Sequence, residues 1–371
     1  MTGKNCYYLV NTFANVFKGG DRVATLKDIA DRLQLSVSTV SRVVNNKSYV
    51  NPKTRELVNK AIEEMGYTPN QIARSLKVKA TRTIGVVVPD ISEALFSNLI
   101  KGIDEVLSVN GYSIILCDTR ENPAKEIQYL ELLLEKQIDG VILATVSLDQ
   151  EKNGDKKGTP PRALDRFFEA HIPVIFIDNL PHLSRPVDSV IIDNAAASSL
   201  AVNYLADLGH RKIGMISGKV HETTGSERLN GYKAALVRRN LPVAESLIAY
   251  GDYKEESGYR GMVALLERCP DMTAVYVASS KMTYGAIQAI RDRGGSVPES
   301  LSVVGFDVYD PTGLLVPGIT TILQPDGELG QTAARRLIQR LQQGQEARDA
   351  QMVILKPQLK VRGSCRPLPE R

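Results

Sequence analysis

The sequence predicts an all-α head followed by a larger α/β module built on doubly wound parallel sheets. Residues 25–66 place apolar side chains at spacings of three and four, which is the period of amphipathic helices. After residue 83, short apolar runs alternate with helical patterns, as in parallel βαβ units. The length of 371 residues also favours more than one domain.

A helix-turn-helix pattern occupies residues 25–45. Thr25 and Ser36 are residue types that cap helix N-termini, and a short turn precedes Ser36. Each helix has one apolar face, formed by Leu26, Ile29, Ala30 and Leu33 in the first and by Val40, Val43 and Val44 in the second. The other face of the second helix presents Arg42 among small side chains. Such a face fits the DNA major groove, where an arginine can bond both acceptors of a guanine.

A third helix is predicted over 52–65, because Pro52 suits a first helical turn and Gly66 suits a stop. Its expected core stripe is Leu57, Val58, Ala61, Ile62 and Met65. The segment 70–77 that follows is too short to form a stable helix in isolation. Another element must therefore order it.

Two motifs resemble the lactose-repressor (LacI/GalR) family of bacterial regulators: Ser36-Val-Ser-Thr-Val-Ser-Arg-Val-Val-Asn45 and Gly66-Tyr-Thr-Pro-Asn-Gln-Ile-Ala-Arg-Ser-Leu76. They stand at the separation that the family shows. The resemblance implies a DNA-binding head over 23–68, then a hinge helix and linker over 69–83. In the family, two hinge helices pair in a dimer and enter the minor groove, where a leucine wedges between base steps and bends the duplex. Leu76 holds this position here.

The resemblance also assigns contacts with double-stranded operator DNA. Val37, Ser38 and Arg42 correspond to base readers. Ser36 and Asn45 correspond to phosphate contacts. The full set of expected contacts is Ser36, Val37, Ser38, Thr39, Ser41, Arg42, Asn45, Ala73, Leu76 and Lys77.

Composition restricts the class of protein. Residues 23–82 carry eleven Lys and Arg against five Asp and Glu, which suggests that this end meets phosphate. No apolar run reaches the length of a membrane span, so we expect no membrane partner. The scattered cysteines disfavour disulfides and zinc and suit the cytoplasm, and we interpret the dispersed histidines as surface or cap residues. No metal and no cofactor are expected. The cysteines are Cys6, Cys117, Cys269 and Cys365, and the histidines are His171, His182, His210 and His221.

Residues 1–22 do not fit the family pattern, since the family's head begins directly before its first helix. The segment contains apolar and aromatic residues but lacks the charged start and cleavage site of an exported protein. We expect a disordered extension or an incorrectly assigned start, with the native product beginning near Val23. Lys18-Gly19-Gly20 would be encoded by a purine-rich run resembling a bacterial ribosome-binding sequence.

The α/β module is expected over 84–361, followed by a tail over 362–371. Predicted strands cover 83–89, 112–117, 140–144, 173–177, 212–217, 247–250 and 273–278. Predicted helices cover 96–110, 123–137, 163–170, 195–208, 226–240, 256–268 and 283–293. The charged segment 147–161 is interpreted as a solvated loop.

The resemblance implies that this module is a two-lobed, periplasmic-binding-protein-like effector and dimerisation domain, whose chain crosses between the lobes three times. We assign 84–193 and 298–325 to the first lobe, and 194–297 and 326–357 to the second. Ligands of open α/β sheets lie beyond the carboxyl ends of the strands, here in the cleft between the lobes. The expected effector-binding residues are Leu95, Phe96, Thr224, Arg228, Tyr253, Ser280, Lys281 and Asp307.

One departure from the family concerns effector charge. Ser280 stands where the family usually has an Asp that accepts hydrogen bonds from a sugar or base, and Lys281 follows it. Loss of that carboxylate would remove repulsion of an anion, and Lys281 with Arg228 would supply positive charge. This predicts a sugar acid or another small anion. The alternative is that Lys281 points to solvent and Ser280 bonds a neutral sugar.

Catalytic motifs are absent from the strand-to-helix turns, which contain no Gly-rich dinucleotide fingerprint, phosphate loop or Gly-x-Ser-x-Gly elbow, so an enzyme is not expected. The main rival is a periplasmic solute receptor, which shares the two-lobed fold, but the basic head and missing signal peptide argue against it. A head that binds protein instead of DNA is a third reading. We expect a homodimeric transcriptional repressor controlled by a sugar or sugar acid. A tetramer is disfavoured because no Leu-heptad tail follows.

Overall fold

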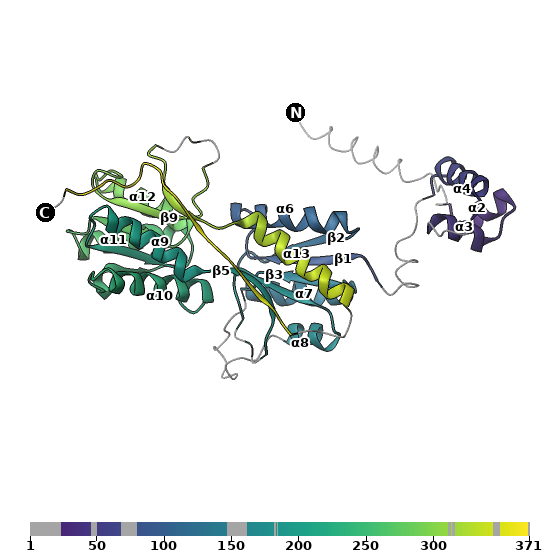
Figure 1. Ribbon diagram of the computed structural model, residues 1–371, viewed down its shortest axis with the longest axis horizontal. Helices are drawn as coiled ribbons and strands as arrows, with labels where there is room; N and C mark the ends of the chain where they lie inside the picture. Colours follow the sequence, from purple (N-terminus) through teal and green to yellow (C-terminus); the bar gives the residue numbers. More distant parts are fainter. Residues whose placement is uncertain are drawn as a thin grey trace, which may run out of the picture. The chain divides into compact units, whose positions relative to one another are not determined.

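The computed structural model describes residues 24–45, 50–67, 80–146, 162–181, 183, 185–310, 313, 316–343 and 349–369. The chain divides into two compact units, Met1–Thr81 and Arg82–Arg371 (Figure 1). The predicted extension 1–22 and the predicted loop 147–161 lie outside the described residues. Within the described part, no helix is both long and apolar enough to cross a membrane.

The head contains the three predicted helices, which are α2 (Leu26–Leu33), α3 (Val37–Val44) and α4 (Pro52–Glu64). Thr25 begins α2 with a capping box, because its hydroxyl accepts from Asp28 N and its own N–H donates to Asp28 Oδ2 at 2.8 Å. Gln34 turns the chain in the left-handed region, with φ of 51°. Each helix contributes one fully buried aliphatic residue to a shared core: Ile29, Val40 and Val58.

The prediction that Leu57 belongs to this core is wrong, because its side chain is 57% exposed. Val58 and Ala61 are the residues of α4 that are buried. Since successive helical residues differ by about 100° in direction, the position directly before Val58 lies on the outer edge of the stripe.

The first six-stranded sheet is wholly parallel and has the order β11-β5-β4-β3-β1-β2. Its strands are β1 (Thr83–Val88), β2 (Ser113–Asp118), β3 (Gly140–Leu143), β4 (Val174–Ile177), β5 (Asp188–Ile192) and β11 (Met352–Leu355). The helices of this lobe are α6 (Ala94–Val109), α7 (Pro123–Glu135), α8 (Arg162–Glu169) and α13 (Asp326–Gln343). Figure 1 shows α13 beside α6. The two helices are in close contact, because a Cβ added at Gly330 of α13 would lie 2.1 Å from Leu99 O of α6.

The second sheet has the order β12-β10-β9-β8-β6-β7 and is parallel except for β12. Its strands are β6 (Ile213–Ser217), β7 (Ile248–Tyr250), β8 (Ala274–Val277), β9 (Ser302–Phe306), β10 (Thr320–Leu323) and β12 (Gln358–Lys360). Its helices are α9 (Asn194–Asp207), α10 (Thr223–Arg238), the 3₁₀ turn η2 (Glu245–Leu247), α11 (Glu255–Arg268) and α12 (Ser280–Asp292). The doubly wound parallel fold predicted from the sequence is thus confirmed for both lobes.

The predicted division of the chain between the lobes is wrong from residue 298 onward. Segment 298–325 carries β9 and β10, which extend the second sheet from β8, so it belongs to lobe two. Segment 326–357 carries α13, which packs on the first sheet, and β11, which pairs with β5, so it belongs to lobe one. A strand that continues a βα series usually pairs within the sheet that the series has built, as β9 and β10 do beside β8.

The C-terminal segment 362–369 is not a free tail, because it is bonded to lobe two. Ser364 Oγ donates to Val303 O at 2.6 Å and accepts from Thr320 N at 2.8 Å. His210 Nε2 lies 3.1 Å from Arg366 O, and this histidine is fully buried. The interpretation of His210 as a surface or cap residue is therefore wrong.

Candidate DNA-binding face and effector pocket

Helix α3 presents most of the predicted DNA contacts on its outer side. Ser36, Val37, Ser38, Arg42 and Asn45 are exposed, whereas the predicted contacts at positions 39 and 41 are half-buried. The helix contains no acidic residue. Its outer face is therefore compatible with a phosphate-rich groove.

Two of these side chains also shape the helix ends. Ser36 Oγ accepts from Thr39 N at 3.1 Å and so caps the N-terminus of α3. Asn45 Nδ2 donates to Ser41 O at 2.7 Å near its C-terminus. Arg42 forms no ion pair within the described residues, so its guanidinium remains available to a ligand. The other predicted contacts, Ala73, Leu76 and Lys77, lie outside the described residues.

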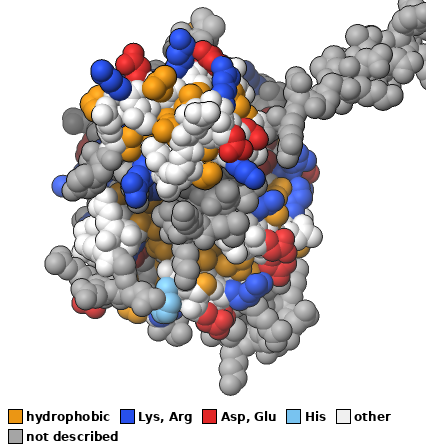
Figure 2. Space-filling model, turned by 90° about the vertical axis from the view of Figure 1, so that its right-hand side faces the viewer, with side chains coloured by type: hydrophobic (Ala, Val, Ile, Leu, Met, Phe, Trp, Pro, Cys, Tyr) orange, Lys and Arg blue, Asp and Glu red, His pale blue; other side chains and the backbone are white. Residues whose placement is uncertain are grey.

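Charged side chains are mixed over the molecular face in Figure 2, where basic, acidic and apolar groups are interspersed. A single large patch of one sign is not visible there. The surface in this view therefore does not indicate a ligand class.

A pocket of about 90 Å³ lies between the two lobes, beyond the carboxyl ends of their strands. Seven of the eight predicted effector residues line it: Leu95, Phe96, Thr224, Arg228, Tyr253, Ser280 and Asp307. Sequence reasoning missed eight polar residues that also line it: Glu93, Glu121, Asp178, Asn179, Lys219, Glu222, Ser279 and Gln324. Most of them follow a strand end in either lobe, which is the signal that could have identified them.

Lys281 does not serve the pocket as predicted. Its Nζ lies 2.7 Å from Asp90 Oδ2 and 3.0 Å from Glu93 Oε1, both carried by lobe one. Burial opposes the charge of this lysine, but the two carboxylates outweigh it and raise the lysine pKa. Hydrogen bonds from Lys281 and Ser92 lower the Asp90 pKa although burial raises it, so this pair is ionised. The positive charge is therefore neutralised across the cleft, and neither the anion-binding nor the solvent-facing reading of Lys281 holds.

Arg228 is fixed in the pocket wall and is only 5% exposed. Its Nε donates to Asn194 Oδ1 at 2.8 Å and its Nη1 donates to Ala278 O at 2.9 Å. The guanidinium carbon lies 3.6 Å from the centroid of the Phe306 ring, which holds the plane of the group by stacking. Both hydrogen-bond partners are neutral, so the full charge of Arg228 acts on the pocket.

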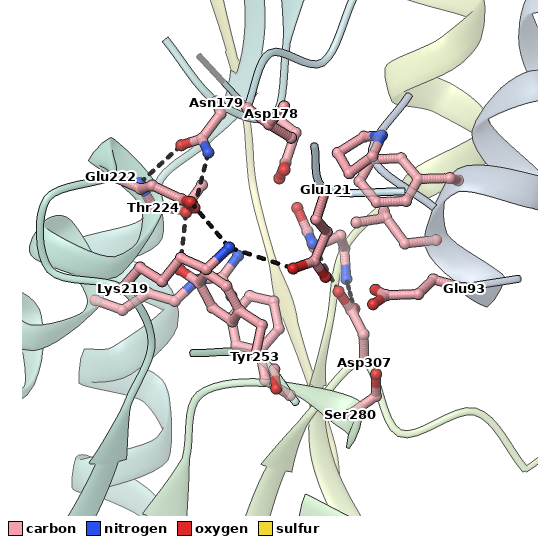
Figure 3. Close-up of a pocket in the computed structure, with 18 of the residues that line it drawn as sticks. Glu93, Glu121, Asp178, Asn179, Lys219, Glu222, Thr224, Tyr253, Ser280 and Asp307 are labelled. Carbon is pink, nitrogen blue, oxygen red and sulfur yellow. Dashed lines mark hydrogen bonds and ion pairs between the residues drawn. The ribbon is translucent and has the colours of Figure 1, made fainter. Parts of the chain in front are cut away.

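Two aspartates face the cavity from opposite lobes, as Figure 3 shows. Asp178 follows β4 and Asp307 follows β9, which are corresponding strands of the two sheets. Both residues adopt left-handed backbone conformations, with φ of 66° and 50°. Burial raises the pKa of Asp178 to about 7 and the pKa of Asp307 to about 6, although Arg228 lowers both.

The hydrogen bonding of the two aspartates differs. Asp307 accepts from Gln324 N at 3.0 Å and from Gln324 Nε2 at 2.6 Å. Within the described part of the chain, no group donates to the carboxylate of Asp178. The buried Oε1 atom of Gln324 also lacks a donor there. The pocket therefore holds acceptors that await donors from a ligand.

Lys219 joins the lobes on another side of the pocket (Figure 3). Its Nζ lies 3.3 Å from Glu121 Oε2 in lobe one and 3.4 Å from Glu222 Oε1 in lobe two. Burial opposes ionisation of this lysine, yet Glu222 and Glu121 together raise its pKa. Asn179 Nδ2 donates to Glu222 Oε2 at 3.0 Å and adds a further contact between the lobes.

Tyr253 forms the aromatic part of the lobe-two wall. Its hydroxyl lies 3.0 Å from Thr224 Oγ1. The ring packs so close to Gly218 that a Cβ at that glycine would lie 2.1 Å from Tyr253 Cε1. Any larger residue at 218 would displace the ring, so this glycine positions it.

Within the described residues, no group of three or more His, Cys, Asp or Glu is arranged to hold a metal ion.

Comparisons with known proteins agree with this organisation. Residues 25–70 match the family described as bacterial regulatory proteins, lacI family. Residues 81–357 match the family described as periplasmic binding proteins and sugar binding domain of LacI family. Catabolite control protein A of Priestia megaterium is 34% identical over 343 residues, which covers 92% of this chain and 99% of that protein. The HTH-type transcriptional repressor CytR of Escherichia coli (strain K12) is 36% identical over 353 residues, covering 95% and 99%.

Solved structures are similar over comparable lengths. The Lac repressor dimer bound to operator and the anti-inducer ONPF has a TM-score of 0.78 and 29% identity, covering 93% of this chain and 100% of that chain. The complex of the transcriptional regulator CelR with cellobiose has a TM-score of 0.68 and 31% identity, covering 92% and 99%. These relatives are transcriptional regulators and not enzymes. Because both family descriptions match in chain order and the relatives align over nearly their whole length, the chain belongs to the LacI family of DNA-binding transcriptional regulators.

Proposed function

We propose that this chain is a homodimeric repressor that binds a pseudo-palindromic operator. The observation that carries the proposal is the exposed, acid-free face of α3, with Arg42 unpaired within the described residues. One recognition helix per chain requires a twofold dimer to read a twofold site. The Lac repressor dimer bound to operator supports this arrangement by similarity.

The operator is found by sequencing random duplexes retained by the purified protein. Arg42→Ala is then expected to lose about 1–3 kcal/mol at one base pair in each half-site, provided that Arg42 reads a guanine. Lys53→Ala, which removes an exposed cation from α4, is the matched control and should retain the base preference. Leu76→Ala is expected to lose specific affinity and duplex bending while keeping salt-sensitive nonspecific binding. Unchanged operator affinity in both the Arg42 and Leu76 variants would refute the proposal.

We propose further that a sugar-class effector occupies the pocket and changes operator affinity. Cellobiose in the CelR complex and ribose in a regulator from Enterococcus faecium support a sugar by similarity. The pocket wall supports a ligand rich in hydrogen-bond donors, because five carboxylates line it against two cations. A sugar acid would add negative charge to that wall, so we no longer expect one.

Calorimetric titration of the full chain with sugars and with the matching uronates tests the effector class. We expect the sugars to bind and the uronates to bind at least tenfold more weakly. Operator retention in a gel is then measured with and without the sugar that binds. Tighter binding of the uronates would overturn the effector class while leaving the operator proposal intact.

A further inference from the structure

The charged groups of the cleft form three clusters, each with two carboxylates and one cation. Lys281 pairs with Asp90 and Glu93. Lys219 pairs with Glu121 and Glu222. The third cluster is Arg228 with Asp178 and Asp307, in which the arginine lowers the pKa of both aspartates. When all its members are ionised, each cluster therefore has one uncompensated negative charge.

The third cluster differs from the others because its cation forms no direct bond to either carboxylate within the described residues. Arg228 donates to Asn194 and to the Ala278 carbonyl instead. Asp307 is satisfied by Gln324, whereas Asp178 receives no donor. When both aspartates are ionised, the excess charge of this cluster is thus located at Asp178, which lines the pocket.

Gln324, beside Asp307, has a buried amide oxygen without a donor in the described part of the chain. This residue is 7% exposed, and its Nε2 donates to Asp307 Oδ2 at 2.6 Å. That geometry directs its other amide atom, Oε1, to a buried position where it accepts no hydrogen bond within the described part. A buried amide oxygen without a donor destabilises the ligand-free pocket. Asp178 and the Oε1 atom of Gln324 therefore lack donors that a ligand can provide. The carboxylate of Asp307 accepts two hydrogen bonds from Gln324 and, having about four acceptor sites, can accept more from a ligand.

We propose that the effector carries a primary ammonium group on a polyhydroxylated frame, as in an amino sugar, and that this group binds between Asp178 and the Asp307–Gln324 pair. The inference rests on the proposed sugar-class function and makes it more specific. An ammonium offers three N–H donors and one positive charge, which matches three acceptors and one excess negative charge. A neutral hydroxyl offers a single donor and leaves the charge in place.

The charged groups around Asp178 determine how binding couples to protons. Arg228, Asp307, Glu222 and Glu93 act on it electrostatically. Since burial raises the pKa of Asp178 to about 7, this carboxyl is about half protonated at pH 7 without ligand. An ammonium in contact with it favours the ionised form, so binding at pH 7 releases up to about half a proton from Asp178. A neutral sugar hydroxyl that donates to the same carboxylate favours the ionised form less and releases fewer protons.

The test compares matched pairs by calorimetry on the full chain at pH 7: glucosamine with glucose, galactosamine with galactose, mannosamine with mannose, and the glucosamine disaccharide with cellobiose. Each titration is repeated in phosphate and in Tris, whose ionisation enthalpies differ. We expect the amine of at least one pair to bind about tenfold or more tightly than its neutral partner, with a buffer-dependent enthalpy that reports proton release.

Asp178→Asn keeps the shape of the side chain and removes its charge. It is expected to weaken amine binding about 10-fold to 100-fold and to reduce the buffer dependence, and to weaken binding of the neutral sugar less than binding of its amine. Asp104→Asn makes the same change on the exposed side of α6 and serves as the control. Thermal unfolding of each variant verifies folding.

The outcomes separate the two proposals. Neutral sugars that bind as tightly as their amines, or amine binding unaffected by Asp178→Asn, would overturn the ammonium inference and leave the sugar-class effector standing. Absence of binding by every member of every pair would contradict the sugar class and this inference together.

Discussion

The two lobes share one topology, but in the described part of the chain the cations of the cleft all come from lobe two, which also supplies the pocket carboxylates Glu222 and Asp307. The charged pocket residues of lobe one are all acidic: Glu93, Glu121 and Asp178. Lobe two supplies the pocket cations, Lys219 and Arg228, and also Lys281, which reaches across to lobe one. The shared strand order fixes where side chains meet but not their sign. The difference indicates that contact between the lobes is electrostatic as well as steric, because Lys219 and Lys281 of lobe two both pair with carboxylates of lobe one.

Among substitutions in the cleft, removal of Arg228 is expected to have the largest effect on stability and on effector binding. Arg228→Met deletes the cation that lowers the pKa of both aspartates and leaves the Asn194 and Ala278 acceptors without their donor. We expect a loss of about 3–5 kcal/mol in the free energy of unfolding and at least 100-fold weaker effector binding.

Urea unfolding and calorimetric titration measure these two quantities. Arg228→Lys is the matched control, since it keeps the charge and loses the planar geometry, and its effect should be intermediate. A Met variant as stable as the parent protein would show that the wall of lobe two does not depend on this cation.

Asp178→Asn is expected to have an intermediate effect on stability, and it should raise the free energy of unfolding instead of lowering it. The folded-state pKa of Asp178, about 7, lies above its ordinary value of 3.8, so its protonated form is favoured on folding. This residue therefore makes the ligand-free protein less stable as pH rises from about 4 to about 7, and the full cost persists above pH 7.

Replacing Asp178 by Asn should consequently raise the free energy of unfolding at pH 8 by on the order of 1 kcal/mol or more, with little gain at pH 4. Urea unfolding at pH 4, 6 and 8 checks this. Equal gains at all three pH values would mean that the asparagine acts through packing and not through charge.

Cutting the pair between the lobes at Lys281 is expected to have the smallest effect. Because Lys281 is about one-third exposed, solvent screens its pairs with Asp90 and Glu93. Lys281→Met should make the closed arrangement of the lobes less favourable by about 0.2–1 kcal/mol. This change should weaken effector binding up to about fivefold and increase the radius of gyration in solution.

Small-angle X-ray scattering with and without effector measures the closure. Lys233→Met removes a comparable pair with Glu245 that lies entirely within lobe two, and it should leave closure unchanged. Identical scattering and affinity for the two variants would show that Lys281 does not hold the lobes together.

The sequence by itself determined the elements whose causes are local. Thr25 and Ser36 cap the first two helices as expected, because a cap involves only the next three residues. The apolar runs predicted strands such as β1 and β6 to within a residue or two. The family resemblance also indicated Arg228 and Asp307, because the motifs around them stand in the chain in a recognisable order.

Only the tertiary structure decided which groups meet across the cleft. Lys281 and Asp90 are 191 positions apart in the chain, and no local pattern links them. The same holds for the exchange of β9, β10 and α13 between lobes, which depends on hydrogen bonding with β8 and on packing against α6. Asp178 was missed because its chemistry comes from burial and from the absence of a donor, and both arise only when the second lobe closes over it.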